Sequence, residues 1–166
     1  MQTKNSTIYY KGEVTLRTSS TISTKSNSGT VALFNSIIRY LSGSAFNQPL
    51  HIPTFLMMYT YGVDADGRPK DPSTWKAILD SYIPLKATYE PIAENSDSLR
   101  AVFTAAYFAT AMGNVDDKYA LALVSSDKAT KLATFLIDDT NFIYSLKAKN
   151  QATIKWTMTI GESISK

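Results

Sequence analysis

The chain contains no cysteine. This absence excludes disulfide bonds, thiol catalysis and cysteine-ligated zinc, so the fold must be stabilised by packing or by assembly. Histidine is nearly absent too, since His51 is the only one among 166 residues. A metal or catalytic role for His51 would need partner residues at a defined geometry, and no sequence motif indicates them. We interpret His51 as an ordinary histidine between a loop and a strand.

Charge is also scarce, because charged residues make up 19% of the chain against about 25% in an average domain. The net charge of +3 comes from 17 basic and 14 acidic residues, which are scattered along the chain. The densest basic cluster, Lys147 to Lys149, is too thin to follow a phosphate backbone, so no nucleic-acid partner is expected. A surface with few charges suits contacts between subunits.

Long hydrophobic runs are missing as well. No apolar run approaches the ~18 residues that a membrane-spanning helix needs, and the first six residues, Met1 to Ser6, are polar. We therefore expect a soluble protein that is made without secretion and has no membrane partner.

The usual catalytic signatures do not occur: there is no G-x-S-x-G, P-loop or dinucleotide-binding glycine pattern. Asp64-Ala-Asp-Gly67 resembles the start of a calcium loop, but the twelfth position of that motif is Trp75 instead of a bidentate glutamate. We interpret it as a glycine-containing turn. The pairs Asp116-Asp117 and Asp138-Asp139 could form a carboxylate cluster, which leaves a hydrolase as a third hypothesis. We predict no catalytic, metal or cofactor-binding residues and no enzyme.

What is present is a strong strand pattern near the carboxyl end. Ala152, Ile154, Trp156, Met158 and Ile160 alternate with threonine and lysine. Successive side chains of a strand point to opposite faces, so this pattern predicts a half-buried strand whose tryptophan lies in the core.

Other segments have strand character. Glu13–Arg17 and Ser19–Lys25 predict a hairpin, and Ser26 to Gly29 then interrupts the pattern. Leu99–Met112 fits both a helix stripe and a strand face, and we predict a long strand because the surrounding chain is rich in β-forming residues. The further predicted strands are Thr54–Tyr61, buried on both faces, and then Tyr119–Ser125, Lys131–Ile137 and Phe142–Leu146.

One helix is predicted, near residues 31–42. Thr30 stands where an N-cap is expected, and Gly43 where a terminating glycine is expected. The apolar stripe between them consists of Phe34, Ile37, Ile38 and Leu41. We therefore predict a mainly β fold: a single domain over residues 1–166, built as an antiparallel β-sandwich of jelly-roll or Ig-like type with one short α-helix.

Residues 62–75 carry turn signals throughout and form the longest break in the pattern. Loops of this length are often functional, although a tolerated insertion is an equally good interpretation. Our candidate partner-contacting residues are Tyr59, Tyr61, Asp64, Asp66, Arg68 and Trp75. Because aromatic rings can also stack on sugars, a carbohydrate- or receptor-binding β-sandwich module is the rival hypothesis.

Two regions resemble a known kind of protein. Tyr119 onward reads Y-A-L-A-L-V-S-S-D, followed by K-L-A-T-F-L-I and A-T-I-K-W-T-M-T-I-G; Gly12 onward reads G-E-V-T-L-R, followed by N-S-G-T-V-A-L-F-N-S-I-I-R-Y-L-S-G. Together they resemble small virion structural proteins and fibre-like β-domains of tailed bacteriophages. The resemblance implies a non-enzymatic virion component of the head, neck, tail or fibre-attachment region. Its partners would be other virion proteins and further copies of itself, and it would be located in virions assembled in the host cytoplasm.

Overall fold

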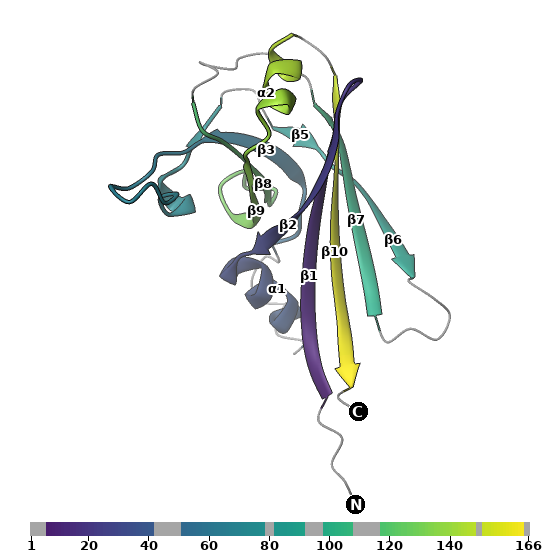
Figure 1. Ribbon diagram of the computed structural model, residues 1–166. Helices are drawn as coiled ribbons and strands as arrows, with labels where there is room; N and C mark the ends of the chain where they lie inside the picture. The colour runs from purple at the N-terminus through teal and green to yellow at the C-terminus, as the bar shows by residue number, and fades with distance from the viewer. Residues whose placement is uncertain are drawn as a thin grey trace, which may run out of the picture.

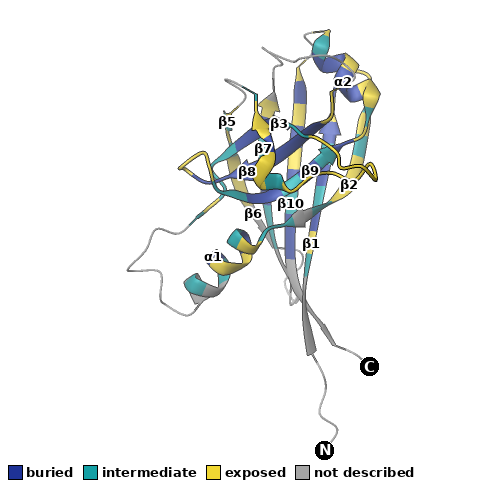
Figure 2. Cartoon of the chain, turned by 90° about the vertical axis from the view of Figure 1, so that its left-hand side faces the viewer, coloured by how far each residue is buried: buried dark blue, intermediate teal, exposed yellow. Residues whose placement is uncertain are grey.

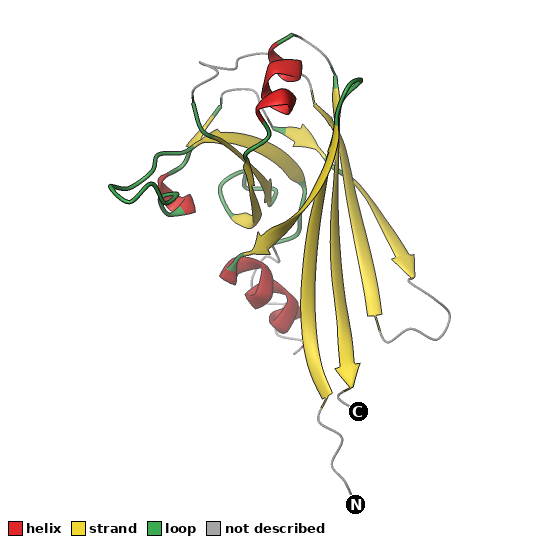
Figure 3. Cartoon of the chain, viewed as in Figure 1, coloured by secondary structure: helices red, strands yellow, loops and turns green. Residues whose placement is uncertain are grey.

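The structure, a computed structural model, describes residues 6–41, 51–78, 82–91, 98–107, 117–148 and 151–164. The fold is mainly β, with two antiparallel sheets that face one another and two helices (Figures 1 and 3). The predicted class, an antiparallel β-sandwich with a short helix near residues 31–42, is confirmed.

The first sheet contains the long strands on the right of Figure 1, in the order β2-β1-β10-β7-β6. Their bounds are β1 Ser6–Arg17, β2 Ile22–Gly29, β6 Lys86–Pro91, β7 Ser98–Tyr107 and β10 Ala152–Ile164. The second sheet runs β4-β3-β8-β9-β2, with β5 also paired to β3. Its further strands are β3 Phe55–Thr60, β4 Lys76–Ala77, β5 Ile83–Pro84, β8 Tyr119–Val124 and β9 Lys131–Ile137.

Strand β10 lies in the middle of the first sheet, and the alternation of its sequence gives it one buried face. Trp156 pairs in register with Val14 of β1 on one side and with Phe103 of β7 on the other. Ala152, Ile154, Trp156 and Met158 are buried, whereas Thr153 and Lys155 are exposed. The prediction of a half-buried strand with a core tryptophan is therefore confirmed.

Strand β2 joins the two sheets. It pairs with β1 from Ile22 to Asn27 and then with β9 through Ser28 and Gly29. The predicted hairpin of β1 and β2 is confirmed, but the predicted interruption from Ser26 to Gly29 is wrong. The small and polar residues at the end of β2 remain in the strand because their backbone groups pair with β1 and then with β9. Side-chain periodicity gives no sign of this change of partner.

The main core lies between the sheets (Figure 2). Its fully buried large side chains include Leu16, Leu56, Met58, Tyr119, Leu121, Leu123, Leu132, Phe142, Leu146, Ile154 and Trp156. A second, smaller cluster forms around Trp75 and the β3 and β8 residues Met57, Tyr59, Ala120, Ala122 and Val124. Strands β3 and β8 are thus apolar on both faces, which confirms that the segment Thr54–Tyr61 is buried on both sides.

Helix α1, Val31–Leu41, begins after Thr30 as predicted. The Thr30 hydroxyl accepts a hydrogen bond from the backbone N–H of Leu33 and also donates to the carbonyl of Lys131, which fastens the helix start to β9. Of the predicted stripe, Ile37 packs against the core, while Phe34 meets the ring of Tyr10 edge-on and stays 41% exposed. The side chains of Ile38 and Leu41, and Gly43 entirely, lie outside the described residues.

The segment Phe142–Leu146, predicted as a strand, is instead part of helix α2, Thr140–Lys147. Asp139 caps it by accepting a hydrogen bond from the N–H of Phe142 at 3.1 Å. Phe142, Ile143 and Leu146 are buried on one face of the helix. The strand prediction was wrong because periodicity alone does not separate a buried helix from a strand in so short an apolar run.

The ambiguous segment Leu99–Met112 forms strand β7, Ser98–Tyr107, as predicted. Residues 108–112 lie outside the described residues. The predicted strands Tyr119–Ser125 and Lys131–Ile137 are also confirmed, as β8 and β9. Strand β6 was not predicted.

Candidate interaction surface

The loop of residues 62–75 projects from the second sheet, on the left of Figure 1, and its tip is exposed (Figure 2). It forms a small hairpin in which the N–H of Asp64 donates to the carbonyl of Arg68 and the N–H of Lys70 donates to the carbonyl of Gly62, both at 2.9 Å. The Asp64 carboxylate accepts the N–H groups of Asp66 and Arg68. Gly67 turns the chain with φ of 79°, which glycine adopts without steric cost. This confirms the turn interpretation of Asp64 to Gly67.

Trp75 fixes the base of this loop to the sheet. It follows the 3₁₀ turn η2, Pro72–Thr74, and its indole N–H donates to the carbonyl of Lys70 at 2.9 Å. Its ring lies against Tyr61, with centroids 5.7 Å apart, and against Tyr59 at 6.2 Å. Because Trp75 and Tyr59 are only 8% and 3% exposed, the loop is anchored by a small aromatic core of its own.

A groove opens between this loop and the sheet, where β2 and β9 diverge. The two strands pair only at Ser28 and Gly29, so the earlier part of β2 separates from the later part of β9. The groove has a volume of about 860 Å³ and is lined by β2 residues 24–27, β9 residues 134–136 and the loop residues 69–72 with Trp75. A second hollow of about 400 Å³ shares Thr30, Asp71 and Pro72 with it. We call the loop and these two hollows together the loop–sheet surface.

Charges of both signs lie on the loop–sheet surface. Lys25 of β2 forms an ion pair with Asp138, which follows β9. Partial burial lowers the pKa of Lys131, although the negative charge of Asp71 opposes this shift. The Lys131 ammonium lies 4.6 Å from the centroid of the Tyr59 ring. The hydrogen bonds that Asp71 accepts from Ser73 lower the pKa of the Asp71 carboxyl. A partner with mixed polar and charged groups would match this lining.

The structure separates the six predicted contact residues into two sets. Asp64, Asp66 and Arg68 are exposed at the loop tip, where they can touch a partner. Tyr59 and Trp75 are buried beneath the loop, and Tyr61 is half-buried beside them. Sequence reasoning missed the β2 and β9 residues of the groove because nothing in the chain indicates that these two strands diverge.

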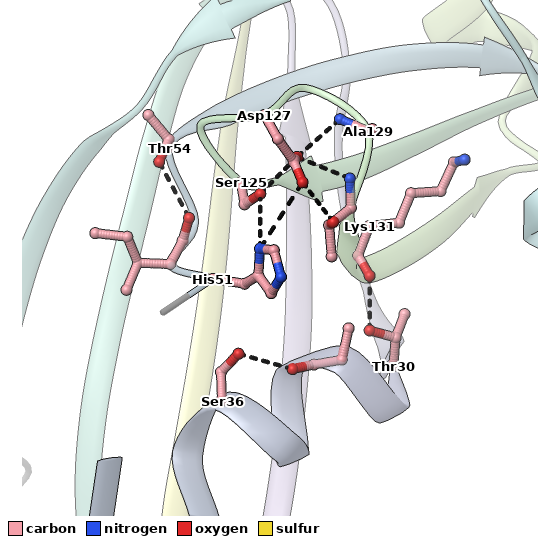
Figure 4. Close-up of polar contacts among 11 residues, drawn as sticks. Thr30, Ser36, His51, Thr54, Ser125, Asp127, Ala129 and Lys131 are labelled. Carbon is pink, nitrogen blue, oxygen red and sulfur yellow. Dashed lines mark hydrogen bonds and ion pairs between the residues drawn. The ribbon is translucent and has the colours of Figure 1, made fainter. Parts of the chain in front are cut away.

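The fold also brings Ser125, His51 and Asp127 together (Figure 4). The Ser125 hydroxyl donates to Asp127 at 2.6 Å, and His51 Nδ1 lies 3.2 Å from Ser125 Oγ and 3.8 Å from Asp127 Oδ2. In a hydrolytic triad the serine and the carboxylate contact different ring nitrogens of the histidine. Here both contact Nδ1, and Ser125 is 1% exposed, so the arrangement differs from that of a triad. The three side chains form a structural hydrogen-bonded cluster.

Asp127 is the shared hydrogen-bond acceptor at the centre of this cluster. It accepts the N–H groups of Ala129 and Thr130 and the Thr130 hydroxyl, at 2.6 to 2.9 Å, and so closes the turn between β8 and β9. Burial alone would raise the pKa of Asp127, but the hydrogen bonds from Ser125, Thr130 and Ala129 outweigh it and lower the pKa well below its usual range.

The aspartate pairs of the hydrolase hypothesis serve other roles where they are described. Asp138 pairs with Lys25, and Asp139 caps α2. Burial raises the pKa of the Tyr119 hydroxyl, and the charge of Asp117 beside it and a hydrogen bond to Asp117 add to the shift; Asp116 lies outside the described residues. Within the described ranges, no group of three or more histidine, aspartate or glutamate side chains is placed to hold a metal ion. The described part of the chain also has no helix that is long and apolar enough to cross a membrane.

Comparison of the chain with family models, with curated proteins and with solved structures gave no match.

Proposed function

We propose that the chain is a non-enzymatic structural protein of a bacteriophage particle, which assembles with other virion proteins and with itself. The observation that supports this most directly is the anchored loop of residues 62–75. A loop whose base is held by Trp75 and whose tip carries Asp64, Asp66 and Arg68 loses little conformational freedom when it docks, and such preorganisation favours association. The phage assignment itself comes from the sequence resemblance.

In this function the mechanism is the geometry of contact. Each copy offers the loop tip and the groove behind it, and repeated weak contacts in an assembly bind far more tightly than one contact alone.

The decisive experiment examines the particle. We expect the coding sequence to lie among portal, capsid or tail genes, and mass spectrometry of purified particles to detect the chain at a fixed copy number. The variant Arg68→Glu, at the loop tip, should lower the copy number in particles, whereas Lys76→Glu, the same charge change on β4, should not. Particles that lack the chain would overturn the proposal.

The rival function, a carbohydrate- or receptor-binding module, is separated by a glycan array with the purified protein. Of the rings that would form a sugar platform, that of Trp75 lies against those of Tyr59 and Tyr61. We expect a blank array. Reproducible sugar binding that Tyr61→Ala abolishes would favour the rival instead.

A further inference from the structure

We infer that strand β6 is a self-complementary edge through which two copies of this chain pair about a two-fold axis at Thr88, extending the first sheet across both copies. This inference rests on the proposed function, since it names one contact of the proposed assembly. It concerns a surface that is separate from the loop–sheet surface.

The strands at the two ends of the strand order differ in length. At one end, β3 is covered by β4 at Tyr59 and Thr60 and by β5 at Phe55 and Leu56, so that edge ends in two-residue strands. At the other end, β6 pairs with β7 over six residues and has no further strand beside it among the described residues (Figure 1). Short edge strands discourage pairing, while a longer free edge presents unpaired backbone groups to another chain.

The side chains at the start of β6 leave the edge accessible. Lys86, Ala87 and Thr88 are all exposed. Pro84 precedes the strand and Pro91 ends it, and proline cannot donate to a ladder. The segment open to pairing is therefore the five residues from Lys86 to Glu90.

These five residues match themselves when reversed. In an antiparallel pair centred on Thr88, Lys86 of one copy stands opposite Glu90 of the second copy, Ala87 stands opposite Tyr89, and Thr88 meets Thr88. A two-fold axis repeats each pair, so the interface contains two opposite-charge pairs and a central pair of threonines. Opposite charges and paired threonines across strands are both stabilising.

The charge pattern continues into the existing sheet. Glu90 already stands in register with Arg100 of β7, and Lys86 stands in register with Thr104. In the paired copies, Glu90 would stand between Arg100 of its own chain and Lys86 of the second copy. Because directly opposed residues share a face of the sheet, a two-fold axis must pass through a residue, and the neighbouring centres are Ala87 and Tyr89. A centre at Ala87 would place Lys86 opposite Thr88, and a centre at Tyr89 would place Glu90 opposite Thr88. Each alternative leaves both charges unmatched, so the charges select the Thr88 register.

Because the chain has no cysteine, introduced cysteines report this register directly. Residues directly opposite in an antiparallel pair have Cα atoms about 4.5–5.5 Å apart, which a disulfide can span. Under mild oxidation Thr88→Cys should form a covalent dimer. Ala87→Cys and Tyr89→Cys should each remain monomeric alone and cross-link when mixed. Thr153→Cys, exposed on β10, is the matched control and should not cross-link.

Charge reversal supplies an independent measurement by sedimentation equilibrium. Lys86→Glu and Glu90→Lys should each weaken self-association about tenfold, and the double variant should restore it, because the pairs re-form with their signs exchanged. Lys155→Glu, on the exposed face of β10, should leave association unchanged. A monomeric wild-type chain at 100 μM, a double variant as weak as the single ones, or cross-linking of Thr153→Cys equal to that of Thr88→Cys would each overturn the inference. Detection of the chain in purified particles would still stand in those cases, so failure of this contact is distinguishable from failure of the proposed function.

Discussion

At the scale of single residues, the most consequential polar group is Asp127. It accepts four hydrogen bonds from the turn between β8 and β9 and from Ser125, so one carboxylate holds the chain reversal between two buried strands. The sequence S-S-D-K-A-T suggests a turn, and aspartate is common in turns. The contact with His51, 76 positions earlier, follows only from the fold.

Replacing Asp127 with asparagine should reduce the free energy of unfolding by about 1 kcal/mol at pH 7, since the carboxylate is partly exposed and solvent weakens its interactions. The folded-state pKa lies below the unfolded value of about 3.9. Its contribution is therefore present above that pH and lost as pH falls further. Chemical denaturation at pH 7 and pH 2.5 should show the difference between wild type and variant shrinking in acid. A difference that is the same at both pH values would contradict this account.

Gly12 is the second critical single residue, because two side chains close over it. A Cβ at this position would lie 1.7 Å from Asn27 Oδ1 and 2.7 Å from the Tyr10 hydroxyl. Burial raises the pKa of that hydroxyl, and the Asn27 side chain partly offsets the shift, so the three residues form one crowded unit between β1 and β2.

We expect Gly12→Ala to lower the free energy of unfolding by about 1–3 kcal/mol through overpacking. Gly62→Ala is the matched control: its Cβ would meet the Lys70 side chain, with Cδ at 3.6 Å and Cε at 3.9 Å, which are ordinary contacts, and the change should stay within about 0.5 kcal/mol. Adding Asn27→Ala to Gly12→Ala should recover part of the loss. Urea denaturation measures all of these variants, and equal losses for Gly12→Ala and Gly62→Ala would show that crowding is not the cause.

At the scale of elements, the loop of residues 62–75 illustrates how an exposed segment is given a fixed shape. Its position was predictable from its turn residues, and its anchoring was not. Trp75 was predicted as a candidate for binding, whereas the structure uses it as the support of the loop. An aromatic residue beside a loop fits both roles until the packing of the neighbouring strands is known.

Trp75→Ala should therefore release the loop. We expect much faster tryptic cleavage after Lys70, the one tryptic bond within residues 62–75, since Arg68 is followed by proline. Global stability should fall by about 3 kcal/mol for the lost aromatic contacts. Trp75→Phe keeps most of the ring contact and should lose only the hydrogen bond to Lys70, about 1 kcal/mol. If both variants are cleaved at the wild-type rate, the loop is not held by Trp75.

Helix α2 was misread because its apolar run is short. Phe142 to Leu146 is a short, mostly apolar run, which fits a strand as well as a helix, and the capping role of Asp139 separates the two possibilities. Aspartate is common both in turns and at helix N-caps, so Asp139 by itself does not show whether the chain after it forms a helix.

Asp139→Ala should cost about 1 kcal/mol of stability, since it removes the cap of α2. The neighbouring Asp138→Ala is a demanding control, because Asp138 makes only an exposed ion pair with Lys25, and such pairs contribute little. Thermal unfolding should place the midpoint of Asp139→Ala a few degrees below that of Asp138→Ala. Equal midpoints would mean that the cap does not stabilise the helix.

At the scale of the whole molecule, the first and last strands lie side by side, because β1 pairs with β10 from Ser6↔Ile164 to Arg17↔Thr153. Trp156 is placed by this pairing at the centre of the core, with its ring 6.4 Å from that of Phe135 in the second sheet. Both sheets must assemble to bury it.

The variant Trp75→Phe leaves Trp156 as the only tryptophan, and so it reports on the assembled core. We expect blue-shifted emission and weak quenching by acrylamide in the folded protein, since the side chain is 0% exposed, and a red shift in a single step on unfolding. Circular dichroism should show a mainly β spectrum. Strong quenching in the absence of denaturant would contradict the position of β10.

Alternation and capping residues by themselves determined the class of this fold: the half-buried strand around Trp156, the helix after Thr30 and the turn at Gly67 all follow from local chemistry, because side-chain periodicity and backbone preference act over a few residues. Only the tertiary structure decided which strands are neighbours. The passage of β2 from β1 to β9, the groove that this divergence opens, the meeting of His51 with Asp127 and the place of β6 at the end of the described strand order depend on contacts between strands and loops, which no local pattern encodes.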